Sequence, residues 1–178
     1  MAKPTIDQII ARKKQRTKSV PVVIDADRAS EIETARQALA RAYGQLESLG
    51  PAVDGDDNVR RQALTERVEE LRATMDSFID DGSLAVFTFR AISRNRYKEI
   101  SDANPAIDDK SGYGPEFPPM LVAACAIDPV ITVDDALDMW DSDQWSDAEL
   151  NQLFSAAVEC CRMTATVPLG KDWSGTQN

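Results

Sequence analysis

The chain has 178 residues, of which 43% are hydrophobic, enough to bury a core in one domain or two small ones. Thirty acidic and 20 basic side chains give a net charge of −10, which disfavours binding to nucleic acid or to an anionic membrane and favours a protein partner. No apolar run approaches the roughly 20 residues of a membrane helix, and the first residues lack the apolar stretch of a signal peptide. We therefore expect a cytoplasmic protein.

Histidine is absent from the chain, which removes the commonest general base and the commonest zinc ligand. The three cysteines, Cys125, Cys160 and Cys161, lie in apolar helical patterns, so we expect free, buried thiols and no disulfide. Adjacent helical residues do not share a face, which makes Cys160 and Cys161 a poor metal pair. The sequence predicts no enzyme activity, no cofactor and no metal site.

Residues 1–19 have few apolar side chains and several basic ones. A short helix is predicted from an N-cap at Thr5 to Arg16, with basic residues towards its end. We interpret the segment as a flexible basic arm, with a docking helix for an acidic surface as the alternative. The β-branched run at residues 21–24 then predicts a strand.

Two long helices are predicted over residues 27–49 and 58–80, each with apolar residues at alternating steps of three and four. These positions are Ile32, Ala35, Leu39, Ala42, Leu46 and Leu49, and then Leu64, Val68, Leu71, Met75 and Phe78. The short turn between them favours an antiparallel hairpin. A strand predicted over residues 84–92 follows, so residues 20–92 form a helical hairpin with a two-stranded ribbon at its base.

Residues 93–167 are expected to form a helical, chaperone-like domain, and residues 168–178 a disordered tail. Ser93 is the predicted N-cap of one helix, and Thr132 and Ser146 begin two more. Between them, Pro118 and Pro119 suit the first turn of an apolar helix that Pro129 prevents from continuing past Asp128. This helix has no polar face, so either the helix after Ser146 or a helix of a client protein must cover it.

The predicted fold is therefore mainly α, with a small two-stranded ribbon and a C-terminal helical bundle. A basic patch of Arg90, Arg94 and Arg96 lies beside Tyr97, where a strand passes into a helix. The patch could receive a carboxylate-bearing peptide, or its arginines could pair internally with acidic residues. Since alternating aromatic residues in a strand are usually buried, Phe87, Phe89 and Tyr97 are expected in the core.

Several short motifs between Phe87 and Val158 form a pattern that is more specific than composition. They are Phe89-Arg-Ala-Ile-Ser-Arg-Asn-Arg-Tyr97, Asn104-Pro105, Tyr113, Phe117-Pro-Pro-Met-Leu-Val-Ala-Ala-Cys125, Asp128-Pro129, Trp140, Trp145-Ser-Asp-Ala-Glu149 and Leu153-Phe154. In this half, the chain resembles the tail assembly chaperones of long-tailed, siphovirus-type bacteriophages. The segment from Phe117 to Pro129 is the most specific part of the resemblance.

The resemblance implies a protein without enzyme activity that binds the phage tape measure protein and keeps it soluble while the tail tube assembles. It also implies self-association, association with a longer frameshifted form, a location in the host cytoplasm and absence from the mature virion. The candidate partner interface is Arg90, Arg94, Tyr97, Phe117, Pro118, Met120, Leu121, Trp140 and Trp145. The alternatives are a structural tail or head-completion protein of the virion, and a coiled-coil adaptor that uses the hairpin alone.

Overall fold

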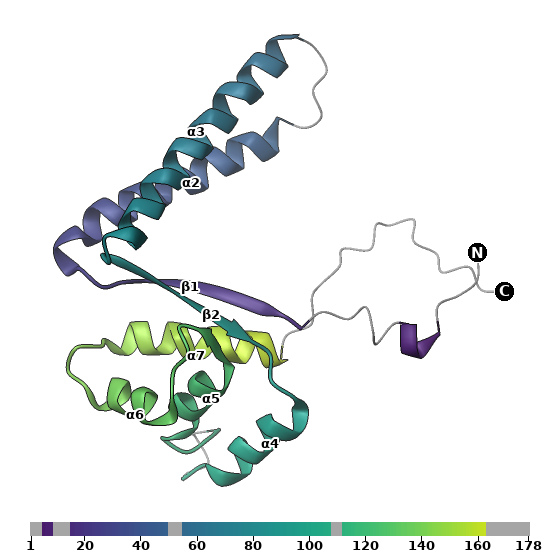
Figure 1. Cartoon of the computed structure of the whole chain (residues 1–178), viewed down its shortest axis with the longest axis vertical. Coiled ribbons are helices and arrows are strands. Elements are labelled where there is room, and N and C mark those ends of the chain that lie inside the picture. The colour runs from purple at the N-terminus through teal and green to yellow at the C-terminus, as the bar shows by residue number, and fades with distance from the viewer. Residues whose placement is uncertain (1–4, 9–14, 50–54, 108–111, 163–178) are drawn as a thin grey trace. The chain divides into compact units, whose positions relative to one another are not determined.

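The computed structural model describes residues 5–8, 15–49, 55–107 and 112–162 (Figure 1). The fold is mainly helical, with one small antiparallel sheet of three strands. The chain divides into two compact units. Residues 19–87 form the inserted unit, and the described parts of residues 1–18 and 88–178 form the flanking unit.

The inserted unit contains the two long helices, preceded by a short 3-10 turn. Their bounds are η1 at Ala26–Arg28, α2 at Ala29–Ser48 and α3 at Gly55–Asp80, the last two lying side by side in Figure 1. Six of the predicted seam residues meet in two buried clusters. One contains Ala42, Val68 and Leu71, and the other contains Ile32, Ala35 and Phe78 together with Leu84, which follows α3. The heptad spacing therefore places these six apolar side chains in the interface between α2 and α3.

Arg28 ties the base of the inserted unit together. Its guanidinium bonds to the Asp81 carboxylate, donates to Ser83 Oγ at 3.2 Å and lies 4.6 Å from the centre of the Phe78 ring. A planar guanidinium can hold a carboxylate with its edge while stacking on a ring with its face. The start of α2 is thereby fixed to the end of α3.

The sheet contains β1 at Thr17–Val23, β2 at Leu84–Arg90 and β3 at Ala126–Asp128, in the order β1-β2-β3. The prediction of a two-stranded ribbon was wrong, because β3 adds a third strand. Ala126 pairs with Phe89 in antiparallel register, and this pairing satisfies an edge that a ribbon would leave open. Phe87 and Phe89 are buried, as predicted from their alternation in the strand.

After β2, the described residues of the flanking unit form four helices and the third strand. Their bounds are α4 at Arg94–Ala103, α5 at Phe117–Cys125, α6 at Val133–Asp141 and α7 at Asp147–Arg162. The three predicted N-caps are confirmed. Ser93 Oγ accepts from the Arg96 N–H at 3.2 Å, while Thr132 and Ser146 each form a capping box with the acidic residue three positions on.

The apolar helix α5 lies at the centre of the flanking unit and contacts α4, α6 and α7. It begins at Phe117 with prolines in its first turn, as predicted. It ends at Cys125, three residues before the predicted limit, because Ala126 is extended and joins the sheet. Phe117, Leu121 and Val122 are at most 3% exposed, so neighbouring helices supply the cover that an apolar helix needs.

The beginning of the described chain also differs from the prediction. Thr5 Oγ1 accepts from the Gln8 N–H at 3.4 Å, so Thr5 caps the helical residues 6–8 as expected. The predicted helix does not reach Arg16, since Gln15 and Arg16 lie outside any helix and β1 already begins at Thr17. Residues 9–14 of this prediction lie outside the described residues, as do residues 163–167 and the predicted tail at 168–178.

Candidate functional site

Arg90, Arg94 and Arg96 are placed by one short connection in the flanking unit. Arg90 is the last residue of β2, and the next N–H, that of Ala91, donates to the Arg16 carbonyl at 3.0 Å. The cap at Ser93 then begins α4 immediately, which places Arg94 and Arg96 in its first turn. All three side chains are exposed.

These arginines differ in their ionic partners. Arg96 donates to Glu99 at 3.1 Å, an exposed i,i+3 pair of small energetic value. Within the described residues, Arg90 and Arg94 form no ion pair. The first turn of a helix favours negative charge, so helix stability does not explain two arginines in the first turn of α4. Within the described residues, the charges of Arg90 and Arg94 are therefore not neutralised by an acidic side chain.

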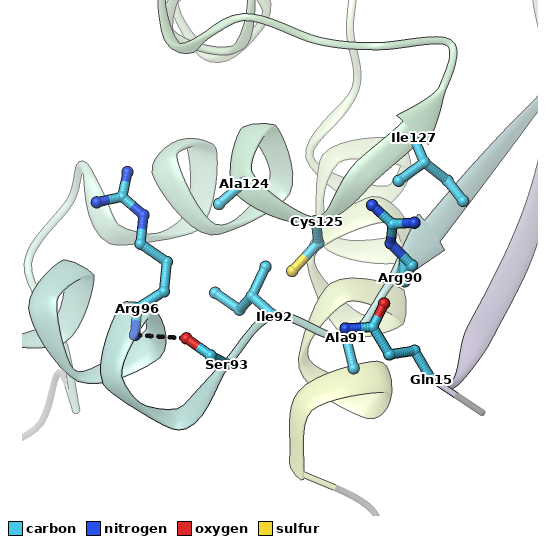
Figure 2. Close-up of a pocket in the computed structure, with 9 residues that line it drawn as sticks. All are labelled: Gln15, Arg90, Ala91, Ile92, Ser93, Arg96, Ala124, Cys125 and Ile127. Carbon is cyan, nitrogen blue, oxygen red and sulfur yellow. Dashed lines mark hydrogen bonds between the residues drawn. The ribbon is translucent and has the colours of Figure 1, made fainter. Parts of the chain in front are cut away.

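A pocket of about 280 Å³ lies at the same connection. Figure 2 shows the side chains of Arg96 and Arg90 on either side of it, with Ile92, Ala124 and Cys125 between them. The remaining lining residues are Gln15, Ala91, Ser93 and Ile127. The pocket therefore combines an apolar floor with a basic rim, an arrangement suited to an acidic side chain with apolar neighbours.

Tyr97 and Phe117 belong to a cluster of four aromatic rings. The centre of the Phe117 ring lies 5.8 Å from that of Tyr97, 5.2 Å from Tyr113 and 6.0 Å from Phe154. Edge-to-face and offset contacts at these distances stabilise a core beyond the burial of area alone. The pKa of Tyr97 is raised, mainly because partial burial disfavours the phenolate. In this fold the two residues hold α4, α5 and α7 together.

The other residues of the candidate interface are scattered. Leu121 is 0% exposed, whereas Pro118 and Met120 are half-buried on α5. Met120 Sδ accepts from the Asn104 side chain at 3.1 Å. Trp140 on α6 and Trp145 before α7 are also half-buried. Only Arg90 lines the pocket, so the structure does not bring the nine residues together into one surface.

Sequence reasoning missed most of the pocket. Ile92, Ala124 and Cys125 are unremarkable apolar residues in the sequence, and they meet only because β2, α4 and α5 converge. One local signal was available: two arginines follow the cap at Ser93, where acidic residues are the usual choice.

The three thiols are free, as predicted, but two of them lie in contact. Cys125 Sγ is 3.6 Å from Cys161 Sγ, whereas Cys160 Sγ is directed towards the Phe89 carbonyl at 3.7 Å. The contact raises the pKa of Cys125 and lowers that of Cys161, because a hydrogen bond from the Cys125 thiol stabilises a thiolate on Cys161. Spacing in the sequence gave no sign of this pair.

Within the described ranges, no group of three or more cysteine, aspartate or glutamate side chains is arranged to hold a metal ion. None of the helices in the described part of the chain has the length and apolar composition needed to cross a membrane. Comparisons with protein-family models, with curated proteins and with solved structures found no match to this chain.

Proposed function

We propose that the protein is a tail assembly chaperone of a long-tailed bacteriophage, which binds the tape measure protein and keeps it soluble during tail tube assembly. The single observation that carries the proposal is the segment from Phe117 to Pro129, whose sequence resembles the corresponding helix of that family. The proposal includes its wider consequences: no enzyme activity, self-association, a longer frameshifted partner form, a place in the host cytoplasm and absence from the mature virion.

The proposed scaffold is an antiparallel helical hairpin in residues 20–92 and a helical bundle in residues 93–167. The bundle supplies the client site, and the hairpin supplies helical surface for self-association. A net charge of −10 supports solubility of the complex, since like-charged particles repel one another. A tape measure protein is long and helical with apolar stripes. Its chaperone therefore needs apolar helical surface and a high net charge, and it needs no enzyme activity.

The burial of α5 in the flanking unit argues against its use as the client surface. Phe117 and Leu121 are enclosed, so neither can meet a client without unfolding of the unit. The pocket beside Arg90 and Arg96 is the better docking site. An amphipathic client helix would place an acidic side chain between the arginines and an apolar one over Ile92 and Ala124.

Co-expression with the phage tape measure protein tests the function. We expect the soluble fraction of the tape measure protein to rise several-fold with the wild-type chain. The variant Arg90→Glu should lose most of this effect because it places a negative charge on the basic rim. Arg41→Glu on α2 is the matched control, since it makes the same charge change at an exposed residue of the inserted unit that does not line the pocket.

Three results would count against this proposal in different ways. An unchanged soluble fraction with the wild-type chain would remove the chaperone function. A rise that Arg90→Glu and Arg41→Glu reduce equally would keep the function but remove the pocket as its site. Detection of the protein in purified virions would favour the alternative of a structural tail or head-completion protein.

A further inference from the structure

Cys125 and Cys161 are held face to face by two different helices. Cys125 is the last residue of α5, and Cys161 lies in the last turn of α7. Their sulfur atoms are 3.6 Å apart, and a disulfide requires about 2.05 Å. Closing the bond therefore requires the two sulfurs to approach by about 1.5 Å, a movement on the scale of small side-chain adjustments.

The surroundings of the pair make the two sulfurs chemically unequal. Cys125 is 0% exposed but lines the pocket at the strand-to-helix connection, while Cys161 is half-buried. The thiol of Cys125 and the Ile92 backbone both stabilise negative charge on Cys161, which lowers its pKa. Cys161 is therefore the better nucleophile and the more accessible of the two.

Cys160 is excluded from the pair by its position on α7. Adjacent residues on a helix point about 100° apart. Its sulfur lies against the Phe89 carbonyl at 3.7 Å, and burial raises its pKa. This adjacent thiol differs from Cys161 in orientation, burial and the direction of its pKa shift, so it serves as a control for the pair.

We propose that Cys125 and Cys161 form a peroxide-sensitive thiol pair that closes to a disulfide between α5 and α7. The Cys161 thiolate attacks one oxygen of a hydroperoxide, forming an S–O bond as the O–O bond breaks and hydroxide leaves. Cys125 then attacks the Cys161 sulfur, the S–S bond forms, and the hydroxyl leaves as water with the proton of Cys125. The two thiols supply the two electrons that reduce the peroxide. The inference is independent of the proposed function.

The reaction is tested on the reduced full-length protein treated with hydrogen peroxide, followed by alkylation and non-reducing peptide mapping. We expect loss of two of the three thiols, an intrachain link between the Cys125 and Cys160–Cys161 peptides, and full reversal by dithiothreitol. No protease separates Cys160 from Cys161 usefully, so variants assign the partner. Cys160→Ala should form the link at the wild-type rate, and Cys161→Ala should not form it.

Other outcomes overturn the proposal. These are a link between two chains, a link through Cys160 in wild-type protein, irreversible oxidation of Cys161 without a disulfide, or loss of the link in a folded Cys160→Ala variant. Circular dichroism before treatment confirms that each variant is folded. If Cys161→Ala does not fold, fragmentation of the linked wild-type peptide still shows which of the two adjacent cysteines carries the bond.

Discussion

Gly114 occupies a position where a side chain has no room. Its N–H donates to the Asn104 carbonyl at 3.0 Å, and a Cβ atom there would lie 2.9 Å from the Pro105 carbonyl oxygen. A contact this short forces the backbone before α5 to move. The residue thus fixes the approach of the chain to the first turn of α5.

We predict that Gly114→Ala lowers the free energy of unfolding by about 1–3 kcal/mol, since the added methyl overpacks backbone against backbone. Gly112→Ala is the control, because its Cβ would meet nothing within 4 Å. It should change stability by less than about 0.5 kcal/mol. Urea denaturation measures both values, and equal effects would show that the close approach at Gly114 does not exist.

Asp135 completes the capping box of α6 with a carboxylate that accepts from Thr132 Oγ1 at 2.6 Å and from its N–H at 3.0 Å. These bonds lower the pKa of Asp135 in the folded state. The pKa of Asp135 in the folded state lies below its pKa in the unfolded state, which is about 3.9. The stabilisation is therefore fully present above about that pH. It is lost as the pH falls through the folded value.

The variant Asp135→Asn carries no titrating group at this position. We predict a lower Tm than wild type at pH 7 and a difference that shrinks as the pH is lowered below about 4. Asp134→Asn is the control, since it removes a carboxylate from the same helical turn outside the capping box. Thermal melts across pH 2.5–7 make the comparison, and a constant difference between wild type and Asp135→Asn would contradict the prediction.

Predictability at the residue scale depends on how local the interaction is. The caps at Ser93, Thr132 and Ser146 were predictable because each needs only a residue within three positions. The contact between Cys125 and Cys161 joins residues 36 positions apart and follows from helix packing. No pattern of spacing encodes such a contact.

Among the elements, α5 is the one whose burial decides whether it stabilises the fold or binds a client. Val122 is 0% exposed in the middle of the helix, and Val133 at the start of α6 is 40% exposed. Replacing valine by alanine at the two positions therefore compares the loss of buried methyl groups with the loss of exposed ones. The difference reports whether α5 stabilises the fold.

We predict that Val122→Ala lowers the free energy of unfolding by about 2 kcal/mol, through lost burial and a small cavity. Val133→Ala should cost less than about 0.5 kcal/mol, since alanine favours the helix and little burial is lost. Chemical denaturation gives both values. Equal costs would mean that α5 is not enclosed and is available to a client.

Element type was easier to predict from the sequence than element ends. Prolines at 118 and 119 correctly marked the start of α5, because proline suits a first helical turn. The end at Cys125 was missed because Ala126 leaves the helix to pair with Phe89, a partner 37 positions earlier. Tertiary pairing here overrides a continuous apolar pattern.

At the scale of the whole molecule, the sequence indicated a mainly helical protein but not how the units are built. The heptad seam predicted the α2 and α3 helices because both partners carry matching patterns. The flanking unit instead depends on residues from both sides of the inserted unit, such as the ion pair of Lys18 and Glu159 at 2.7 Å. The pocket also draws on Gln15 and Ile127, so no single segment of sequence describes it.

This division has a consequence for the order of events during synthesis. Lys18 leaves the ribosome long before Thr88, since the whole inserted unit lies between them. At about 5–20 residues per second, that interval is roughly 4–14 s, far longer than helix formation takes. We expect the inserted unit to fold first on the nascent chain, and stalled chains ending beyond residue 120 should already protect residues 19–87 from pulse proteolysis. Early folding would bring Ser19 close to Phe87 and so shorten the loop that the flanking unit has to close.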